Sequence, residues 1–223
     1  SRAGLRVDQT SGTSAYAGGT ATIAFPTTGK WYVEGYMNSN APALNDTFAF
    51  GLKSVSVHGA MLTPSTAYTD GALYLTRQDA GSYIGIDGAT QSNLIGTNMT
   101  YSATHKIALA FDADSGKFWF GRDNGTGGLL WWNNNGNQDG NPSAGTNQTG
   151  TLTANHEYIF AYDFYRTTGN YGVTFNFGQD SSFDGVITSG SASAADANGN
   201  GDFYHTTPTN LYRYRYRYSS YRS

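Results

Sequence analysis

The stretch IALAFDADSGKFWF, residues 107–120, decides the fold of this 223-residue chain. Apolar residues alternate with small alanines over 105–111, which predicts a half-buried strand. The residues DADSG at 112–116 favour a tight turn, because Asp bonds the local backbone and Gly accepts a positive φ. The aromatic run at 117–121 then returns as the partner strand. A hairpin of this kind predicts an antiparallel sheet.

The rest of the chain repeats this alternation of short strands and turns. Runs of β-branched and aromatic residues are separated by clusters of Gly, Asn, Asp and Ser, and helical periodicity is nearly absent. The sequence therefore predicts an all-β fold, with further strands at residues 30–37, 47–53, 72–77, 82–86, 157–165 and 171–177.

The composition narrows the class of protein. Charged residues make up only 13% of the chain and aromatic residues 15%, which disfavours disorder. The absence of cysteine excludes disulfides, thiol chemistry and cysteine metal sites. No run of about 18 apolar residues indicates a membrane span. We expect one domain over residues 1–210, and the start SRAG, without Met, predicts a processed protein or an excerpt of a longer one.

The segment LYRYRYRYSSYRS at 211–223 is unlike the rest of the chain. It holds four of the 13 basic residues, so the remainder carries 9 basic against 16 acidic residues and is a poor nucleic-acid binder. As a strand, it would place Tyr on one face and Arg on the other. It could add to a neighbouring subunit, bind a nucleic-acid strand as a flexible arm, or complete its own sheet. The residues assigned to assembly are Tyr212, Arg213, Tyr214, Arg215, Tyr216, Arg217 and Tyr218.

Several motifs, in order, resemble one known family. GKWYVE at 29–34, FAFGL at 48–52, the hairpin at 107–120 and VTFNFGQ at 173–179 are similar to strands of SPRY-type, concanavalin A-like sandwiches. The resemblance implies an antiparallel β-sandwich that is generally non-enzymatic and binds proteins or glycans through its edge loops.

A narrower resemblance is to SPRY-like proteins of tailed bacteriophages. It rests on GNPSAGTN at 140–147 and on DANGNGDF at 196–203. The resemblance implies a virion component, such as a fibre, an appendage or a head decoration, at the virion surface or outside the cell. The Tyr/Arg segment departs from the family, so no role for it is carried over.

No catalytic residue is predicted. Glycosidases need two nearby carboxyl groups, whereas the two glutamates, Glu34 and Glu157, are far apart in sequence. We interpret Glu34 as a structural partner between strands. Asp112 and Asp114 are two residues apart but lie in the predicted turn. The four histidines lack metal-binding spacing, and there is no serine-nucleophile elbow.

The segment DANGNGD at 196–202 matches the start of a calcium loop, with oxygen ligands at alternate positions. Thr207 stands where such a loop carries its bidentate Glu. A plain Asx-turn network would have the same sequence. The cofactor is therefore either none or calcium, with candidate ligands Asp196, Asn198, Asn200 and Asp202.

The long irregular segment at 124–149 holds two tryptophans and is the best candidate for ligand binding. Exposed aromatic rings can stack on sugar faces while amides bond hydroxyls. The alternative is that one or both tryptophans pack on the sandwich or form a subunit contact. The candidate residues are Trp131, Trp132, Asn133 and Asn135.

Together these observations favour a non-enzymatic structural or adhesive surface module of a phage virion. Its partners would be further copies of itself, other virion proteins or a host glycan, and neither nucleic acid nor a membrane. The alternatives are a secreted bacterial carbohydrate-binding adhesin and, from another class, a glycan-cleaving enzyme that uses aspartates.

Overall fold

The computed structural model describes residues 5–9, 15–37, 47–56, 71–77, 81–86, 89–91, 106–123, 128–166, 171–188 and 194–213. All regular elements in these ranges are strands. They are β1 (Leu5–Gln9), β2 (Ala15–Ala24), β3 (Lys30–Met37), β4 (Thr47–Ser54), β5 (Gly71–Arg77), β6 (Gly81–Ile86), β7 (Ala89–Gln91), β8 (Lys106–Asp112), β9 (Lys117–Asp123), β10 (Leu129–Trp131), β11 (Gly150–Thr151), β12 (Tyr158–Arg166), β13 (Tyr171–Asn176) and β14 (Tyr212–Arg213).

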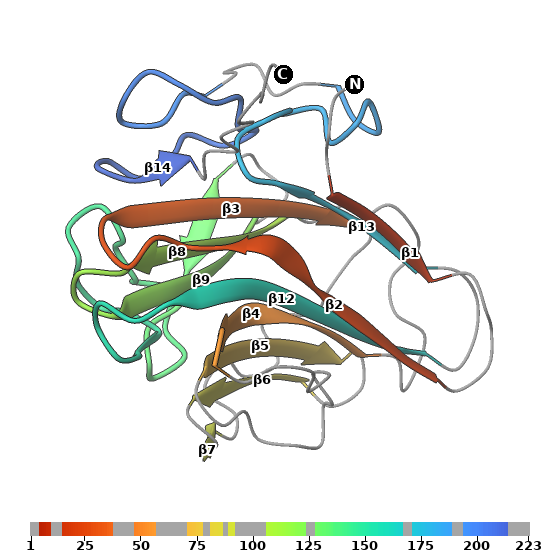
Figure 1. Ribbon diagram of the computed structural model, residues 1–223, viewed down its shortest axis with the longest axis horizontal. Coiled ribbons are helices and arrows are strands. Elements are labelled where there is room, and N and C mark those ends of the chain that lie inside the picture. The colour runs from red at the N-terminus through yellow and green to blue at the C-terminus, as the bar shows by residue number, and fades with distance from the viewer. Residues whose placement is uncertain are drawn as a thin grey trace, which may run out of the picture.

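The strands form two sheets (Figure 1). The eight-stranded sheet has the order β1-β13-β3-β8-β9-β10, with β11 beside β9 and β14 beside β3. The six-stranded sheet has the order β2-β12-β4-β5-β6-β7. The predicted class, an all-β antiparallel sandwich of the concanavalin A-like type, is confirmed. In the described ranges, no helix has the length and apolar character needed to span a membrane.

The hairpin predicted at 105–121 is β8 and β9, paired from Ile107↔Arg122 to Asp112↔Lys117. Asp112 Oδ1 accepts the backbone N–H groups of two turn residues, at 3.1 and 3.3 Å. Gly116 has a φ of +72°, and a Cβ there would collide with a neighbouring carbonyl. The turn interpretation of Asp112 and Asp114 therefore describes what the structure shows.

Aromatic side chains fill the space between the sheets. Phe50 of β4 meets Phe120 of β9 edge-to-face, with ring centroids 5.2 Å apart. Phe160 of β12 meets Phe175 of β13 in the same way at 4.7 Å. Such pairs add a specific contact to the burial of large apolar surfaces. The aromatic alternation of the sequence thus fixes how one sheet sits on the other.

The eight-stranded sheet is buried on its second face as well. Residues 194–211, here called the cover segment, lie on the side away from the six-stranded sheet (Figure 1). Together with residues of β3, β8 and β9 they form a small second core, which consists of Tyr32, Ala108, Ala110, Trp119, Ala194, Phe203 and Leu211. Ala108 and Ala110 of β8, which face away from the core between the sheets, are therefore also buried.

The segment after the cover segment begins as a strand of the same sheet. β13 ends beside Glu34 of β3, and β14 continues along that edge in the parallel sense, with Tyr212↔Trp31 and Arg213↔Tyr32. β8 occupies the other edge of β3. Residues 214–218, which the sequence also assigned to assembly, lie outside the described residues.

A buried carboxyl group lies on the other sheet. Asp163 of β12 is almost fully buried, and neither of its carboxylate oxygens has a hydrogen-bond partner of normal geometry in the described part of the chain. Burial raises the pKa of Asp163 to about 7, and the backbone N–H of Phe164 opposes the rise in part. Below about pH 7, the folded protein therefore favours the neutral acid.

This burial predicts a pH dependence of stability. The raised pKa of Asp163 stabilises the fold at pH values below 3.8, the ordinary pKa of the group. That stabilisation is lost as the pH rises towards about 7. Asp163→Asn stays neutral, so its melting temperature relative to wild type should rise between pH 4 and pH 7 and then level off. Calorimetry at several pH values measures this difference. A difference that stays constant with pH would contradict the prediction.

Candidate functional site

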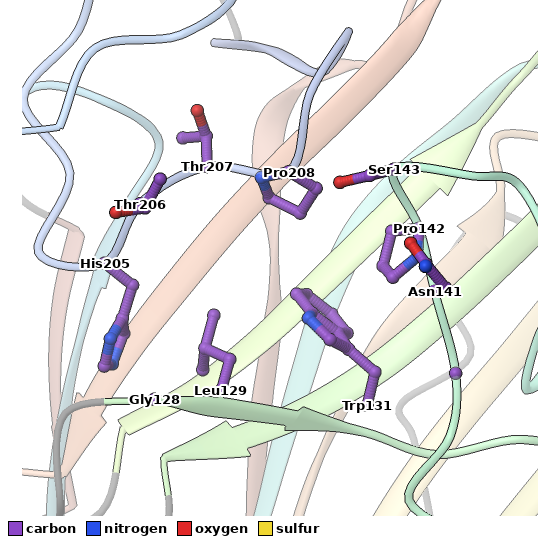
Figure 2. Close-up of a pocket in the computed structure, with 11 residues that line it drawn as sticks. Gly128, Leu129, Trp131, Asn141, Pro142, Ser143, His205, Thr206, Thr207 and Pro208 are labelled. Carbon is purple, nitrogen blue, oxygen red and sulfur yellow. The ribbon is translucent and has the colours of Figure 1, made fainter.

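A groove of about 500 Å³ opens on the covered face of the eight-stranded sheet, beside β10 (Figure 2). β10 forms its floor, and two walls come from residues 140–143 and 205–208. Figure 2 shows the Trp131 ring standing between these walls. The lining residues are Gly128, Leu129, Trp131, Gly140, Asn141, Pro142, Ser143, His205, Thr206, Thr207 and Pro208.

Two glycines make room for Trp131. A Cβ on Gly121 would lie 2.7 Å from the indole ring, and one on Gly140 would lie 3.0 Å from the Trp131 backbone. The ring also approaches Tyr32, with centroids 6.2 Å apart. Trp131 is partly buried. One side of the indole is thus supported by the sheet, while the ring still lines the groove.

The wall at 140–143 is held by short-range bonds and by the sheet. Asn141 and Thr146 exchange two backbone hydrogen bonds, of 3.0 and 3.1 Å. Trp119 Nε1 donates to the carbonyl of Thr146 at 3.0 Å. The two walls are joined to each other, since the Thr209 N–H donates to Ser143 Oγ at 3.0 Å. The groove is therefore preformed.

The wall at 205–208 is held by a buried carboxylate of β3. Glu34 is fully buried and accepts the backbone N–H groups of Tyr204 and His205, each at 2.8 Å. Tyr32 Oη also donates to Glu34, at 2.8 Å. Asn176 Nδ2 donates to the Asp202 carbonyl at 2.8 Å. These bonds fix the backbone where it enters the wall.

The ring of His205 meets a second buried group. Its Nε2 lies 3.4 Å from Asp123 Oδ2, and Lys106 Nζ donates to the same oxygen at 3.2 Å. All three residues are more than nine-tenths buried. Lys106 Nζ also lies 4.1 Å from the ring centroid of Tyr204, a cation–π distance. Charged groups therefore surround His205 behind the groove.

The cluster affects titration. Burial raises the pKa of Glu34 above its ordinary value, while the charge of His205 and the hydrogen bonds from His205, Tyr204 and Tyr32 lower it in part. Burial, and then the charge of Glu34, raise the pKa of Tyr32 well above its ordinary value. The charge of His205 and three hydrogen bonds thus offset part of the cost of burying Glu34.

The sequence candidates in the tryptophan loop separate in the structure. Trp131 lines the groove, but Trp132 is fully buried in the core between the sheets, and so cannot contact a surface ligand. Asn133 is buried, and its Oδ1 accepts two backbone N–H groups of its own turn. Asn135 is exposed and does not line the groove. For Trp132 and Asn133 the structure therefore shows packing and turn roles.

The candidate calcium loop forms a closed turn. Asp196 Oδ1 accepts the backbone N–H groups of Asn198 and Asn200, at 2.9 and 2.8 Å. The Asn200 side chain donates to the Asn198 carbonyl at 3.0 Å. No group of three His, Cys, Asp or Glu side chains suited to a metal ion occurs in the described ranges. The Asx-turn alternative thus accounts for the Asp196 Oδ1 contacts.

The turn geometry predicts the response to calcium. Because Asp196 Oδ1 is already engaged by backbone donors, millimolar calcium should leave the melting temperature within about 1 °C of its value in EDTA. Magnesium at the same concentration is the control for general salt effects. A calcium-specific rise of several degrees would contradict the turn assignment and would identify the loop as a metal site.

Most of the groove was missed by reasoning from sequence. His205, Thr206 and Pro208 face Trp131 across more than 70 residues of chain, and a sequence gives no sign of that proximity. The only available signal was indirect. The segment at 140–147 belongs to the motifs that carry the family resemblance, but its side chains had no assigned role.

Comparison with known proteins gives fold similarity only. No family model and no curated protein matches the chain. The SPRY domain of human HERC1 is 15% identical, with a TM-score of 0.48, over 75% of this chain and 86% of that domain. The Emp46p carbohydrate recognition domain, in a potassium-bound form, is 11% identical, with a TM-score of 0.44, over 76% and 82%. Both have concanavalin A-like folds.

Proposed function

We propose that this chain is a non-enzymatic surface module that binds an uncharged glycan in the groove over Trp131. The observation that carries the proposal is the character of the lining. An indole ring stands between two preformed walls that present hydroxyl and amide groups. Sugars offer the matching chemistry, with apolar ring faces for stacking and hydroxyl groups for hydrogen bonding.

The lining also bears on the alternatives. No carboxyl or cationic side chain other than His205 is among the lining residues, and hydrolysis of a glycosidic bond requires a pair of carboxyl groups at the substrate. Asp123 lies behind His205 and is nearly fully buried. An uncharged lining also disfavours a phosphate-rich or strongly anionic ligand. We therefore propose binding without bond cleavage.

Trp131→Ala tests the groove directly. Loss of the stacking surface should weaken binding to neutral oligosaccharides on a glycan array at least about tenfold, as expected for a central aromatic anchor. Asn135→Ala, exposed but outside the groove, should bind like wild type. Melting temperatures of both variants show whether the fold is kept.

Two results would refute this function. The first is the absence of any wild-type signal with neutral oligosaccharides. The second is a folded Trp131→Ala variant that gives the same signal as wild type. Preferential binding of wild type to sulfated or phosphorylated glycans would contradict the uncharged ligand.

For the biological setting, we propose a virion surface component of a tailed phage that assembles in many copies. The proposal rests on the motif resemblance and on the Tyr/Arg alternation of residues 211–223. The two residues of β14 already pair with β3 of the same chain, so assembly would use the residues after 213. A secreted bacterial adhesin with the same groove is the alternative. It would bind the same class of glycan without needing the Tyr/Arg segment for assembly.

A truncation separates these settings. Leu211 is buried in the second core, so the cut should follow residue 213 and leave β14 in place. Removal of 214–223 should lower the particle mass measured by light scattering while changing the melting temperature little. A full-length protein that is strictly monomeric would contradict assembly through this segment and favour the adhesin.

A further inference from the structure

The wall at 205–208 is held by charged groups that are largely buried. Glu34 is fully buried, Asp123 is 2% exposed and Lys106 is 8% exposed. Burying charged groups costs several kcal/mol each unless their partners compensate. The core between the sheets needs none of these three, because aromatic pairs already fill it. Their arrangement therefore requires its own explanation.

The three charged groups act on one residue from two sides. Glu34 accepts the backbone N–H of His205 at 2.8 Å. Asp123 Oδ2 lies 3.4 Å from the His205 ring, and Lys106 donates to that oxygen. The backbone of His205 is thus fixed by a hydrogen bond to β3, while its ring Nε2 lies beside a carboxylate of β9 without a hydrogen bond to the described residues. His205 is the first residue of the wall that faces Trp131 (Figure 2).

We propose that Glu34, Asp123 and Lys106 are positioning residues that clamp His205 and so hold the groove wall in its binding geometry. None of them lines the groove. The clamp acts through preorganisation, because a wall that is already ordered loses less conformational entropy when a ligand binds. The link to binding rests on the proposed function, whereas the clamp itself concerns only the free protein.

Glu34→Gln is the main variant, and Glu157→Gln is its matched control. Gln keeps the size of Glu but removes the charge and one acceptor oxygen, so the two backbone N–H groups lose a charge-assisted partner. Glu157 is the other glutamate and is exposed, so the same chemical change there leaves the wall unaltered. Melting temperatures verify that both variants fold.

Hydrogen exchange followed residue by residue is the first readout. In Glu34→Gln, the amide protons of Tyr204 and His205 should exchange at least about tenfold faster than in wild type, while those of β8 and β9 keep their rates. In Glu157→Gln all of these rates should match wild type. Unchanged exchange at Tyr204 and His205 in Glu34→Gln would overturn the clamp.

Binding to the same array of neutral oligosaccharides is the second readout. Glu34→Gln should bind about threefold to tenfold more weakly than Glu157→Gln. Faster exchange combined with an undiminished array signal would overturn the role in binding. If wild type gives no array signal, the proposed glycan function fails, and the exchange experiment still decides whether the clamp exists.

A second variant keeps the test decisive if Glu34→Gln does not fold. Asp123→Asn removes the charge that faces the His205 ring and Lys106 without changing the side-chain shape. It should increase exchange at His205 and weaken array binding relative to Glu157→Gln. Wild-type values in both measurements would overturn the proposal.

Discussion

The hydrogen bonds accepted by the Glu34 carboxylate are the interactions on which the groove depends. The carboxylate is fully buried on β3 and receives hydrogen bonds from Tyr32, Tyr204 and His205. A carboxylate without these donors would be too costly to bury. Two of these donors, the backbone N–H groups of Tyr204 and His205, are in place only if the cover segment lies on the sheet, so the carboxylate and the cover segment require each other. The groove is a product of that mutual requirement.

Sequence patterns were sufficient where a strand carries its own local signal. β3, β8 and β9 begin within one residue of their predicted starts, because alternation and a turn signal define them locally. β2 lacked such a signal, since AYAGGTATIA holds small residues and few strong strand formers. β10, β11 and β14 have three residues or fewer, too short for a period to be recognised.

The site was predicted only at Trp131, and the reason is physical. Alternation along β3 and β8 shows which residues share a face, but it does not reveal that a distant segment covers the second face. The same limit explains why the sequence did not separate the roles of Trp131 and Trp132. Neighbours on a strand point to opposite faces, so one aromatic ring had to enter the core and the other the groove. Their order could not be decided without knowing which face each sheet buries.

The separation in sequence between Glu34 and its backbone partners has a consequence for synthesis. The hydrogen bond to Tyr204 spans 170 residues. During translation β3 emerges long before the cover segment, so a nascent sandwich would carry Glu34 without its two backbone donors, beside exposed Tyr32 and Trp119. The outer layer can close only after about residue 211 has left the ribosome. A nascent chain stalled before that point exposes this face, to which chaperones or other unfolded chains can bind.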